Sequence, residues 1–168
     1  KAAEGMAETP ALVGARCMFG VYHWARGDLV AAGKYLDGRA DKAPPSADTL
    51  LQVAKDWSGG VYQLHAGRLA FGKQILDRAM SVYDSKAHAP LVVLCGMDPG
   101  AGSLAWLTNL NSHLGYLDTA MAEAREGIDL AERASHPLTL ALALCLASIA
   151  AATCRSTEST IDWSDACI

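Results

Sequence analysis

The chain has 168 residues, of which 51% are hydrophobic, 19% charged and 7% aromatic, and its formal net charge is −4. This length and composition predict one globular domain over residues 1–168 and exclude an intrinsically disordered chain. Nucleic-acid recognition needs a concentrated basic face, and the sequence has no basic run, so we expect no nucleic-acid partner.

Helical periodicity interrupted by proline and glycine predicts an all-α chain of stacked antiparallel helical hairpins, with about seven helices. Three hairpins are expected at about 10–43, 46–84 and 98–135, followed by a partial one at 137–168. Residues 91–95 (LVVLC) are the only β-branched apolar run, and an isolated strand cannot satisfy its backbone. We therefore expect a connector or a short helix there.

Helix starts are predicted where a capping side chain stands or where proline opens the first turn. The predicted starts are Ser46 before TLLQVAKDW, Asp98 with Pro99 at the first helical position, and Ser135 or His136 before Pro137.

The uncharged run Leu138–Thr153 has about 16 residues, which is short for a membrane span of about 20. We expect a buried helix there and no membrane partner.

The run GMDPGAGS at 96–103 raises the question of a phosphate-binding loop. It lacks GxGxxG, and Gly102 stands where GxxxxGK[ST] needs its lysine. We expect the glycines to form a turn and Asp98 to start a helix. The alternative, an anion bound at that helix start, stays open, although Asp98 would repel it.

The five cysteines stand at positions 17, 95, 145, 154 and 167. Their number is odd and no pair has CxxC spacing, a pattern typical neither of a disulfide framework nor of a zinc site. We expect reduced thiols in a cytoplasmic protein.

Three segments align on a turn glycine: YHWARGDLVAAGKYLDGRA (22–40), YQLHAGRLAFGKQILDRAM (62–80) and NLNSHLGYLDTAMAEAREGI (109–128). The turn glycines stand at 27, 67 and 115, which makes the period 40 and then 48 residues. A small residue follows each glycine five positions later, where it lets two helices approach closely. One hairpin cannot bury its apolar face alone, so the hairpins must stack.

This pattern resembles the tetratricopeptide repeat, whose usual period is about 34 residues. In that family a small residue is followed by glycine, alanine and proline, and the first segment matches it with Gly20, Gly27, Ala32 and Pro44. The resemblance implies a right-handed superhelix of antiparallel helices.

A longer resemblance covers residues 62–147. They are similar to the tetratricopeptide segment of large bacterial regulators that carry a class III adenylate or guanylate cyclase domain, or another signalling domain, with an AAA-type ATPase. The matching elements are Tyr83-Asp84, His88, Gly96-Met97-Asp98-Pro99-Gly100, Leu114-Gly115-Tyr116 and His136-Pro137, with Met97 in place of the usual glutamine. The resemblance implies a helical interaction segment and carries over no cyclase or ATPase activity, because their catalytic motifs are absent.

In tetratricopeptide arrays the first helix of each hairpin lines a concave groove. Carried over by register, the groove positions here are Cys17, Val21, Trp24, Trp57, Val61, Leu64, His65, Ala105, Asn109, Ser112 and His113. Among them we expect Trp24, Trp57, His65, Asn109 and His113 to contact a partner. The alternative for Trp24 and Trp57 is a role in the core between helices.

The sequence therefore predicts a non-catalytic protein-interaction or regulatory module, a segment of a bacterial signalling regulator, that binds a peptide or helix in its groove. The alternative is a small-molecule sensor with a pocket between hairpins. Neither HExxH nor GxSxG occurs, and the pair Glu123/Glu126 is expected on a solvated helix face, so we expect no enzyme, no catalytic residue, no metal and no cofactor.

The partner is expected to be a protein or peptide, with other domains of the same full-length chain as one source. Lys1 and the polar tail suggest a piece of a longer protein. An incomplete last hairpin would leave an open end to the stack, through which a homodimer is possible.

Overall fold

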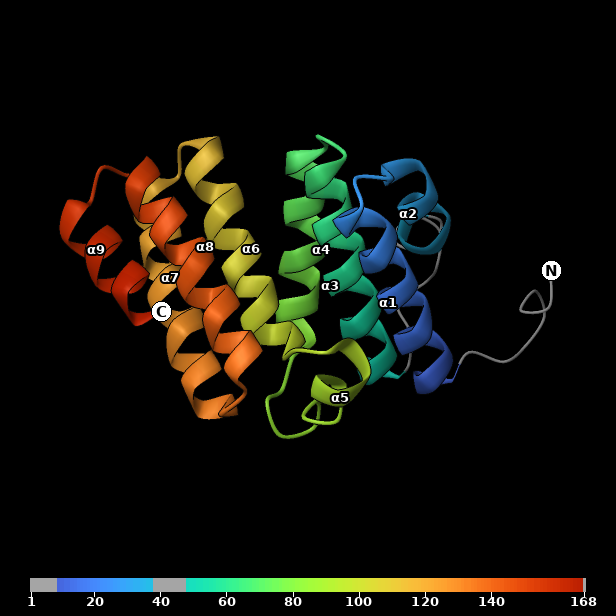
Figure 1. The fold of residues 1–168 in the computed structure, drawn as a ribbon. Coiled ribbons are helices and arrows are strands. Elements are labelled where there is room, and N and C mark those ends of the chain that lie inside the picture. Colours follow the sequence, from blue (N-terminus) through green and yellow to red (C-terminus); the bar gives the residue numbers. More distant parts are fainter. Residues whose placement is uncertain (1–8, 38–47, 168) are drawn as a thin grey trace.

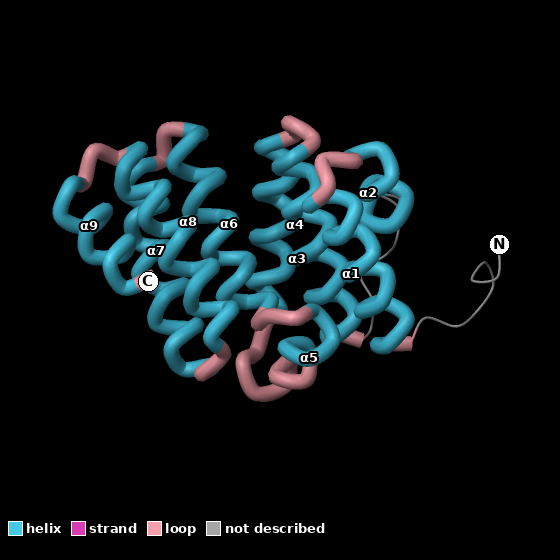
Figure 2. Tube along the Cα trace, viewed as in Figure 1, coloured by secondary structure: helices cyan, strands magenta, loops and turns pink. Residues whose placement is uncertain are grey.

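The computed structural model describes residues 9–37 and 48–167, and within these ranges the chain contains nine helices and no strand (Figures 1 and 2). Their bounds are α1 Pro10–Ala25, α2 Leu29–Leu36, α3 Thr49–His65, α4 Leu69–Val82, α5 Leu91–Cys95, α6 Pro99–Leu114, α7 Leu117–Ala134, α8 Pro137–Thr153 and α9 Thr157–Ala166.

Eight of these helices form four antiparallel hairpins in the described part of the chain: α1–α2, α3–α4, α6–α7 and α8–α9. Each first helix packs on both helices of the hairpin before it. Thus α3 packs on α1 and α2, α6 on α3 and α4, and α8 on α6 and α7. The prediction of an all-α stack of helical hairpins is confirmed.

The described residues contain nine helices, two more than the approximate number of seven that was predicted. Residues 91–95 form the short helix α5, which was one of the two interpretations of that run. Residues 157–166 form α9, so the partial hairpin predicted at 137–168 is complete.

Two of the predicted helix starts are confirmed. Asp98 caps α6 with Pro99 at the first helical position, and His136 caps α8 with Pro137 in the same place. The predicted cap Ser46 lies outside the described residues.

The cap of α3 is Asp48. Its carboxylate accepts hydrogen bonds from the backbone N–H groups of Leu50 and Leu51, at 3.0 and 3.4 Å. These bonds satisfy two N–H groups that have no partner within the helix itself.

All four hairpins turn in the same way. Gly27, Gly67 and Gly115 have φ of 76°, 80° and 87°, and the fourth turn places Arg155 at φ 59°. In each turn this residue donates its N–H to the carbonyl three residues back, and the next residue donates to the carbonyl five residues back. This arrangement ends a helix on a left-handed residue. The turn of the last hairpin is thus built without glycine.

The two helices of a hairpin approach closely where the small residues stand. A Cβ atom on Gly60 of α3 would lie 2.6 Å from the Leu76 side chain, and one on Gly72 of α4 would lie 3.1 Å from the Gly60 carbonyl oxygen. Ala32 and Ala120 occupy the position of Gly72 in the first and third hairpins, and both are fully buried.

A buried charge fixes α4 against α3. Asp56 is 1% exposed, and Arg78 of α4 donates Nε–H and Nη2–H to its two carboxylate oxygens at 2.8 and 2.7 Å. Gln52 adds a third bond, from its side-chain amide, at 2.6 Å. A buried carboxylate is tolerated only with such partners, so this group sets the position of one helix along the other.

The apolar run Leu138–Thr153 lies within α8, which packs on α6, α7 and α9. Over the described ranges, none of the helices combines the length and the hydropathy that crossing a membrane would require.

The left-handed turn residues give a first prediction. Arg155→Gly should stabilise the fold by about 1 kcal/mol, because an L side chain is strained at positive φ, and Gly67→Ala should destabilise it by about 1–2 kcal/mol. Urea unfolding followed by far-UV circular dichroism measures both changes. The control is Arg26→Gly. Arg26 has φ −87° and stands one position before the turn glycine Gly27, so the substitution should bring no gain. A loss of stability in Arg155→Gly would contradict the prediction.

Candidate functional site

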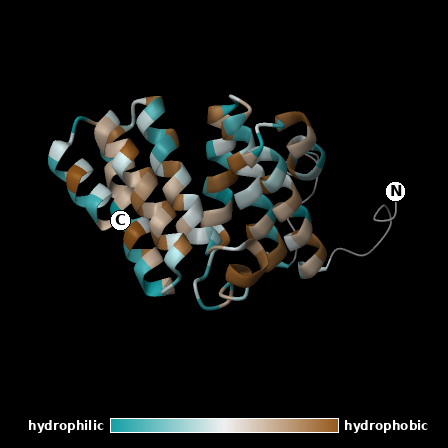
Figure 3. Cartoon of the chain, viewed as in Figure 1, coloured by the Kyte–Doolittle hydropathy of each residue, from teal (hydrophilic) through white to brown (hydrophobic). Residues whose placement is uncertain are grey.

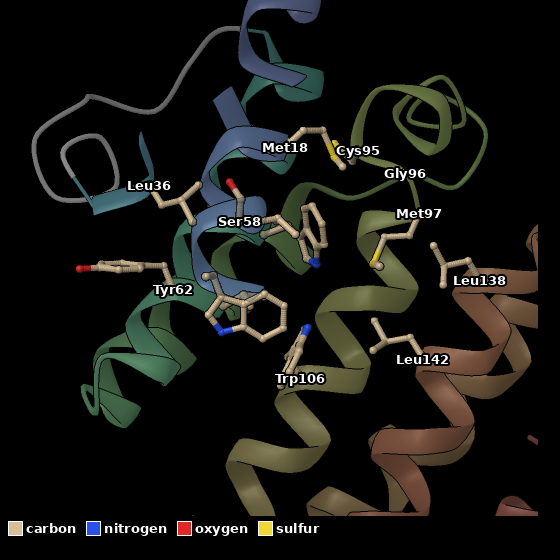
Figure 4. A pocket seen from close by; sticks show the side chains of 14 residues that line it. Met18, Leu36, Ser58, Tyr62, Cys95, Gly96, Met97, Trp106, Leu138 and Leu142 are labelled. Atoms are coloured by element: carbon tan, nitrogen blue, oxygen red, sulfur yellow. The ribbon is translucent and has the colours of Figure 1, made fainter. Parts of the chain in front are cut away.

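A pocket of about 180 Å³ lies between the first helices of the hairpins, and its lining is almost wholly apolar. Figure 4 shows side chains from opposite sides facing a common space, with Met18 of α1, Trp106 of α6 and Leu142 of α8 among them. The full lining is Met18, Val21, Trp24, Leu36, Trp57, Ser58, Val61, Tyr62, Cys95, Gly96, Met97, Trp106, Leu138 and Leu142.

The connector between α4 and α6 closes one side of this pocket. Its short helix α5 is strongly hydrophobic (Figure 3) and packs on α1, α3 and α6. Cys95, Gly96 and Met97, at the end of α5 and just after it, form that wall. The pocket thus depends on a segment that is not part of any hairpin.

Four of the predicted groove residues line the pocket: Val21, Trp24, Trp57 and Val61. The register carried over from the turn glycines therefore named residues on the faces of α1 and α3 that line the pocket. It did not find the contributions of α5, α8 and the connector.

An aromatic cluster stands at the pocket. The rings of Trp24 and His65 are 4.6 Å apart, those of His65 and Trp106 are 4.9 Å apart, and the two indoles are 6.1 Å apart, all edge to face. Trp24 and His65 are half-buried, and Trp106 is buried. Such contacts add to the burial energy of the rings and hold the cluster in one geometry.

The surroundings of His65 favour its neutral form. Its Nδ1 lies 2.7 Å from the Val61 carbonyl oxygen, which only accepts, so Nδ1 carries the hydrogen in the neutral ring. Burial lowers the pKa of His65 from its ordinary value, and the bond to Val61 opposes this shift in part. The ring thus packs on the two indoles as an uncharged aromatic group.

Trp57 is a core residue and not an exposed contact. It is 4% exposed, and its Nε1–H finds no hydrogen-bond acceptor among the described residues. A Cβ on Gly102 would lie 2.8 Å from that nitrogen, so glycine is needed there. Of the two interpretations of Trp57, the structure supports the core one, with the side chain forming part of the pocket wall.

Asn109 and His113 lie outside the pocket lining. His113 is exposed and donates Nδ1–H to the Asn109 carbonyl oxygen at 2.7 Å. They follow Trp106 on α6 by three and seven residues, so they continue the same helix face toward the turn. The structure brings Trp24 and His65 together at the pocket and places these two further along α6.

Trp106 is one of the pocket residues that sequence reasoning missed. The carried-over register named its neighbour Ala105, which is 3% exposed and belongs to the core. The spacing to Asn109 and His113 was a usable signal, because these three residues share one helix face.

The connector is held by one carboxylate. Tyr83 donates its hydroxyl hydrogen to the Asp98 carboxylate, whose oxygens lie 2.8 and 3.0 Å away, and the Asp98 N–H donates to the Thr139 hydroxyl at 3.0 Å. Burial raises the pKa of Tyr83 above its ordinary value, and the charge of Asp98 adds to this. Asp98 thus joins the connector, α6 and α8.

His88 has a structural role in the same connector. It is 1% exposed, and its Nδ1 accepts the Asp84 N–H at 2.8 Å. Its Nε2 then carries the hydrogen in the neutral ring and donates to the Thr49 hydroxyl at 3.1 Å. This bond ties the connector to the start of α3.

The glycines of GMDPGAGS have two roles. Gly96 ends α5 at φ 74°, which is the predicted turn, whereas the glycines inside α6 allow close packing. A Cβ on Gly100 would come within 2.4 Å of the Tyr83 ring. Asp98 is 3% exposed and its carboxylate accepts the Ala101 N–H at 2.8 Å. The Asp98 carboxylate and the Tyr83 ring therefore cover the first turn of α6, an arrangement that disfavours an anion bound there.

All five cysteines lie in the described ranges as free thiols, and burial raises the pKa of Cys95, which lines the pocket, to about 12. A thiol with that pKa is not a nucleophile at neutral pH. Within the described ranges, no three His, Cys, Asp or Glu residues come together in a group that could hold a metal ion.

The acidic pair on α7 is only partly as expected. Glu126 is exposed, as predicted for a solvated face. Glu123 is half-buried, accepts the Asn111 side-chain N–H at 2.6 Å, and has its pKa raised by burial. Its role is to satisfy a buried amide of α6.

No protein-family model, curated protein or solved structure matches this chain. The class of protein is therefore described from its fold and its pocket alone. It is a stack of helical hairpins with an apolar pocket between the first helices.

The core position of Trp57 gives the second prediction. Trp57→Ala should destabilise the fold by about 3–5 kcal/mol, because it opens a large cavity beside the pocket. Trp163→Ala is the matched control, since Trp163 in α9 is only half-buried and should cost less. Urea unfolding compares the two. A smaller loss for Trp57→Ala than for Trp163→Ala would show that Trp57 is not part of the core.

The cluster around His65 gives the third prediction. The pKa of His65 in the folded chain lies below its ordinary value of 6.5, so the unfolded chain takes up this proton first as the pH falls. The stability tied to the neutral ring is present above pH 6.5 and is lost as the pH falls below it. Tryptophan fluorescence should change with pH, with a midpoint below pH 6.5, because the His65 ring becomes charged beside two indole rings.

The variant His65→Gln should abolish that fluorescence change. His113→Gln, on the exposed part of α6, should leave it in place. A change that survives in His65→Gln would assign it to another group.

Proposed function

We propose that this chain is a non-catalytic protein-interaction module that binds an apolar side chain of a peptide or helix in the pocket between its hairpins. The observation that carries the proposal is the pocket, which lies on the face of the first helices and has Trp24, Trp57 and Trp106 in its lining. Interfaces concentrate their energy in apolar anchors that fill such pockets.

The volume of the pocket favours a single side chain. Small-molecule sites usually measure about 300–1,000 Å³, whereas a cavity of about 150 Å³ accepts benzene. A pocket of about 180 Å³ therefore suits one ring-sized or leucine-sized group. The rest of a peptide would lie along α6, where Asn109 and His113 offer polar groups.

The sequence resemblance supports a regulatory setting. The connector motifs shared with bacterial cyclase-type and ATPase-type regulators supply Asp84, His88 and Asp98 here, and each of these holds the connector. On this basis we infer that the module serves a signalling regulator, with other domains of a longer chain among its possible partners.

A small-molecule sensor is the second candidate. The specific observation for it is the lining, which is almost wholly apolar and of a size to enclose one aromatic ring. Such a ligand would bind through shape and burial alone, since the polar groups at the pocket are few.

The fourth prediction tests the main proposal. Peptides selected on the wild-type chain from a phage-displayed random library should carry an apolar anchor residue. Val21→Trp and Leu142→Trp fill the pocket from opposite walls, and each should weaken the binding of these peptides at least about tenfold. Val30→Trp, at a position that is 81% exposed on α2, is the control and should bind normally.

Equal binding to the wild-type and both filled variants would place the peptide site elsewhere. The single-ring probes benzene, phenol and indole separate the two candidates in a thermal-shift experiment. If they raise the melting temperature of the wild-type chain but not of Val21→Trp, and no peptide is selected, the sensor function replaces the proposed one.

A further inference from the structure

The first helix of the stack has an uncovered apolar face. Phe19 is 57% exposed, Tyr22 53% and Met18 44%. Together with Ala15 they line a shallow hollow of about 320 Å³ on α1. Side chains of this size and spacing form the buried stripe of a helix in a folded domain.

The same positions are buried in the other hairpins. Aligned on the four turn residues, Phe19 corresponds to Gly59, Leu107 and Ala147, and all three are buried. The register of α1 therefore matches the other first helices, and only its covering layer is missing from the described part of the chain.

The positions equivalent to Tyr22 show which helix covers this face in the other hairpins. Its counterparts Tyr62, Leu110 and Ala150 are all buried. In the second hairpin, a Cβ on Gly33 would lie 2.5 Å from the Tyr62 hydroxyl, so α2, the second helix of the preceding hairpin, covers this position. By the same geometry, a second helix of a further hairpin fits over Tyr22.

We propose that the exposed face of α1 is the stacking surface for one more helical hairpin, located upstream of Thr9 in the same polypeptide. At every junction within the chain, the hairpin that covers a first helix directly precedes it. The start of α1 suits such a junction, because Thr9 caps it with Pro10 in the first turn, as His136 and Pro137 do where α8 follows α7.

The far end of a second copy is a poor cover for this face. That end is formed by α8 and α9, and α9, which lies within the described range, has no buried residue and carries Glu158, Asp162 and Asp165 beside Ile161, which is 54% exposed. Ile161 would cover only part of the face of Phe19 and Tyr22, and the three carboxylates would lie against apolar side chains.

The fifth prediction tests this surface. The probe is the natural polypeptide extended upstream by about 40 residues, the length of one hairpin. The extension should raise the melting temperature, and Phe19→Glu should lower that of the extended protein by about 5 °C more than that of the 168-residue chain. The larger loss is expected because only the extended protein buries residue 19.

Val30→Glu is the matched control. Val30 is 81% exposed, and its counterparts Ala70, Asp118 and Glu158 are exposed as well. The substitution should therefore change both proteins equally and slightly.

Three results would overturn the proposal. The first is a reading frame that does not continue upstream into an amphipathic hairpin. The second is an equal effect of Phe19→Glu in the two proteins. The third is a dimer, seen by sedimentation, that persists in the extended protein and is dissociated by Phe19→Glu, which would make a second copy the partner.

Discussion

Each first helix after α1 is buried on two sides at once, against its own second helix and against the preceding hairpin. α6 is the most fully buried of them, since nearly every residue from Pro99 to Ser112 is buried. Such a helix cannot be amphipathic in the ordinary sense, and its polar groups need partners inside the protein. Asn111 is fully buried and reaches Glu123 of α7, which is why a carboxylate of the otherwise solvated α7 face turns inward.

The burial of α6 also explains the contacts that Asp98 makes at the start of this helix. The first turn of α6 leaves N–H groups without helical partners, and here they lie in the interior instead of in water. Asp98 caps that turn, and its negative charge is favourable at the helix start. Tyr83 covers the carboxylate and Thr139 binds the backbone, so three segments meet at one buried acid. The glycine at position 100 follows, because a larger residue would displace the Tyr83 ring.

The parts of the fold that sequence reasoning predicted rest on local rules. A glycine that ends a helix and a proline that opens one depend on backbone conformation alone, so the three turn glycines and the starts at Asp98 and His136 were predictable. α9 was hidden because Arg155 takes the left-handed position in place of glycine and the tail is polar. The burial of Trp57 and the hydrogen bond from Asn111 to Glu123 were not predictable in this way, because both depend on segments that are distant in the chain.

The pocket shows the same division between local and distant effects. The faces of α1 and α3 follow from the repeat register, whereas the wall formed by Cys95, Gly96 and Met97 exists only because the chain inserts α5 between two hairpins. This insertion is what lengthens the period to 48 residues between Gly67 and Gly115.

Within the GMDPG run, the Met97 side chain faces the pocket. A glutamine there would put an amide in need of hydrogen bonds into an otherwise apolar wall. The apolar character of the pocket is therefore set in part by a residue of the connector, outside the repeated pattern. The hairpin helices supply most of the apolar lining, and the inserted segment closes one side of it.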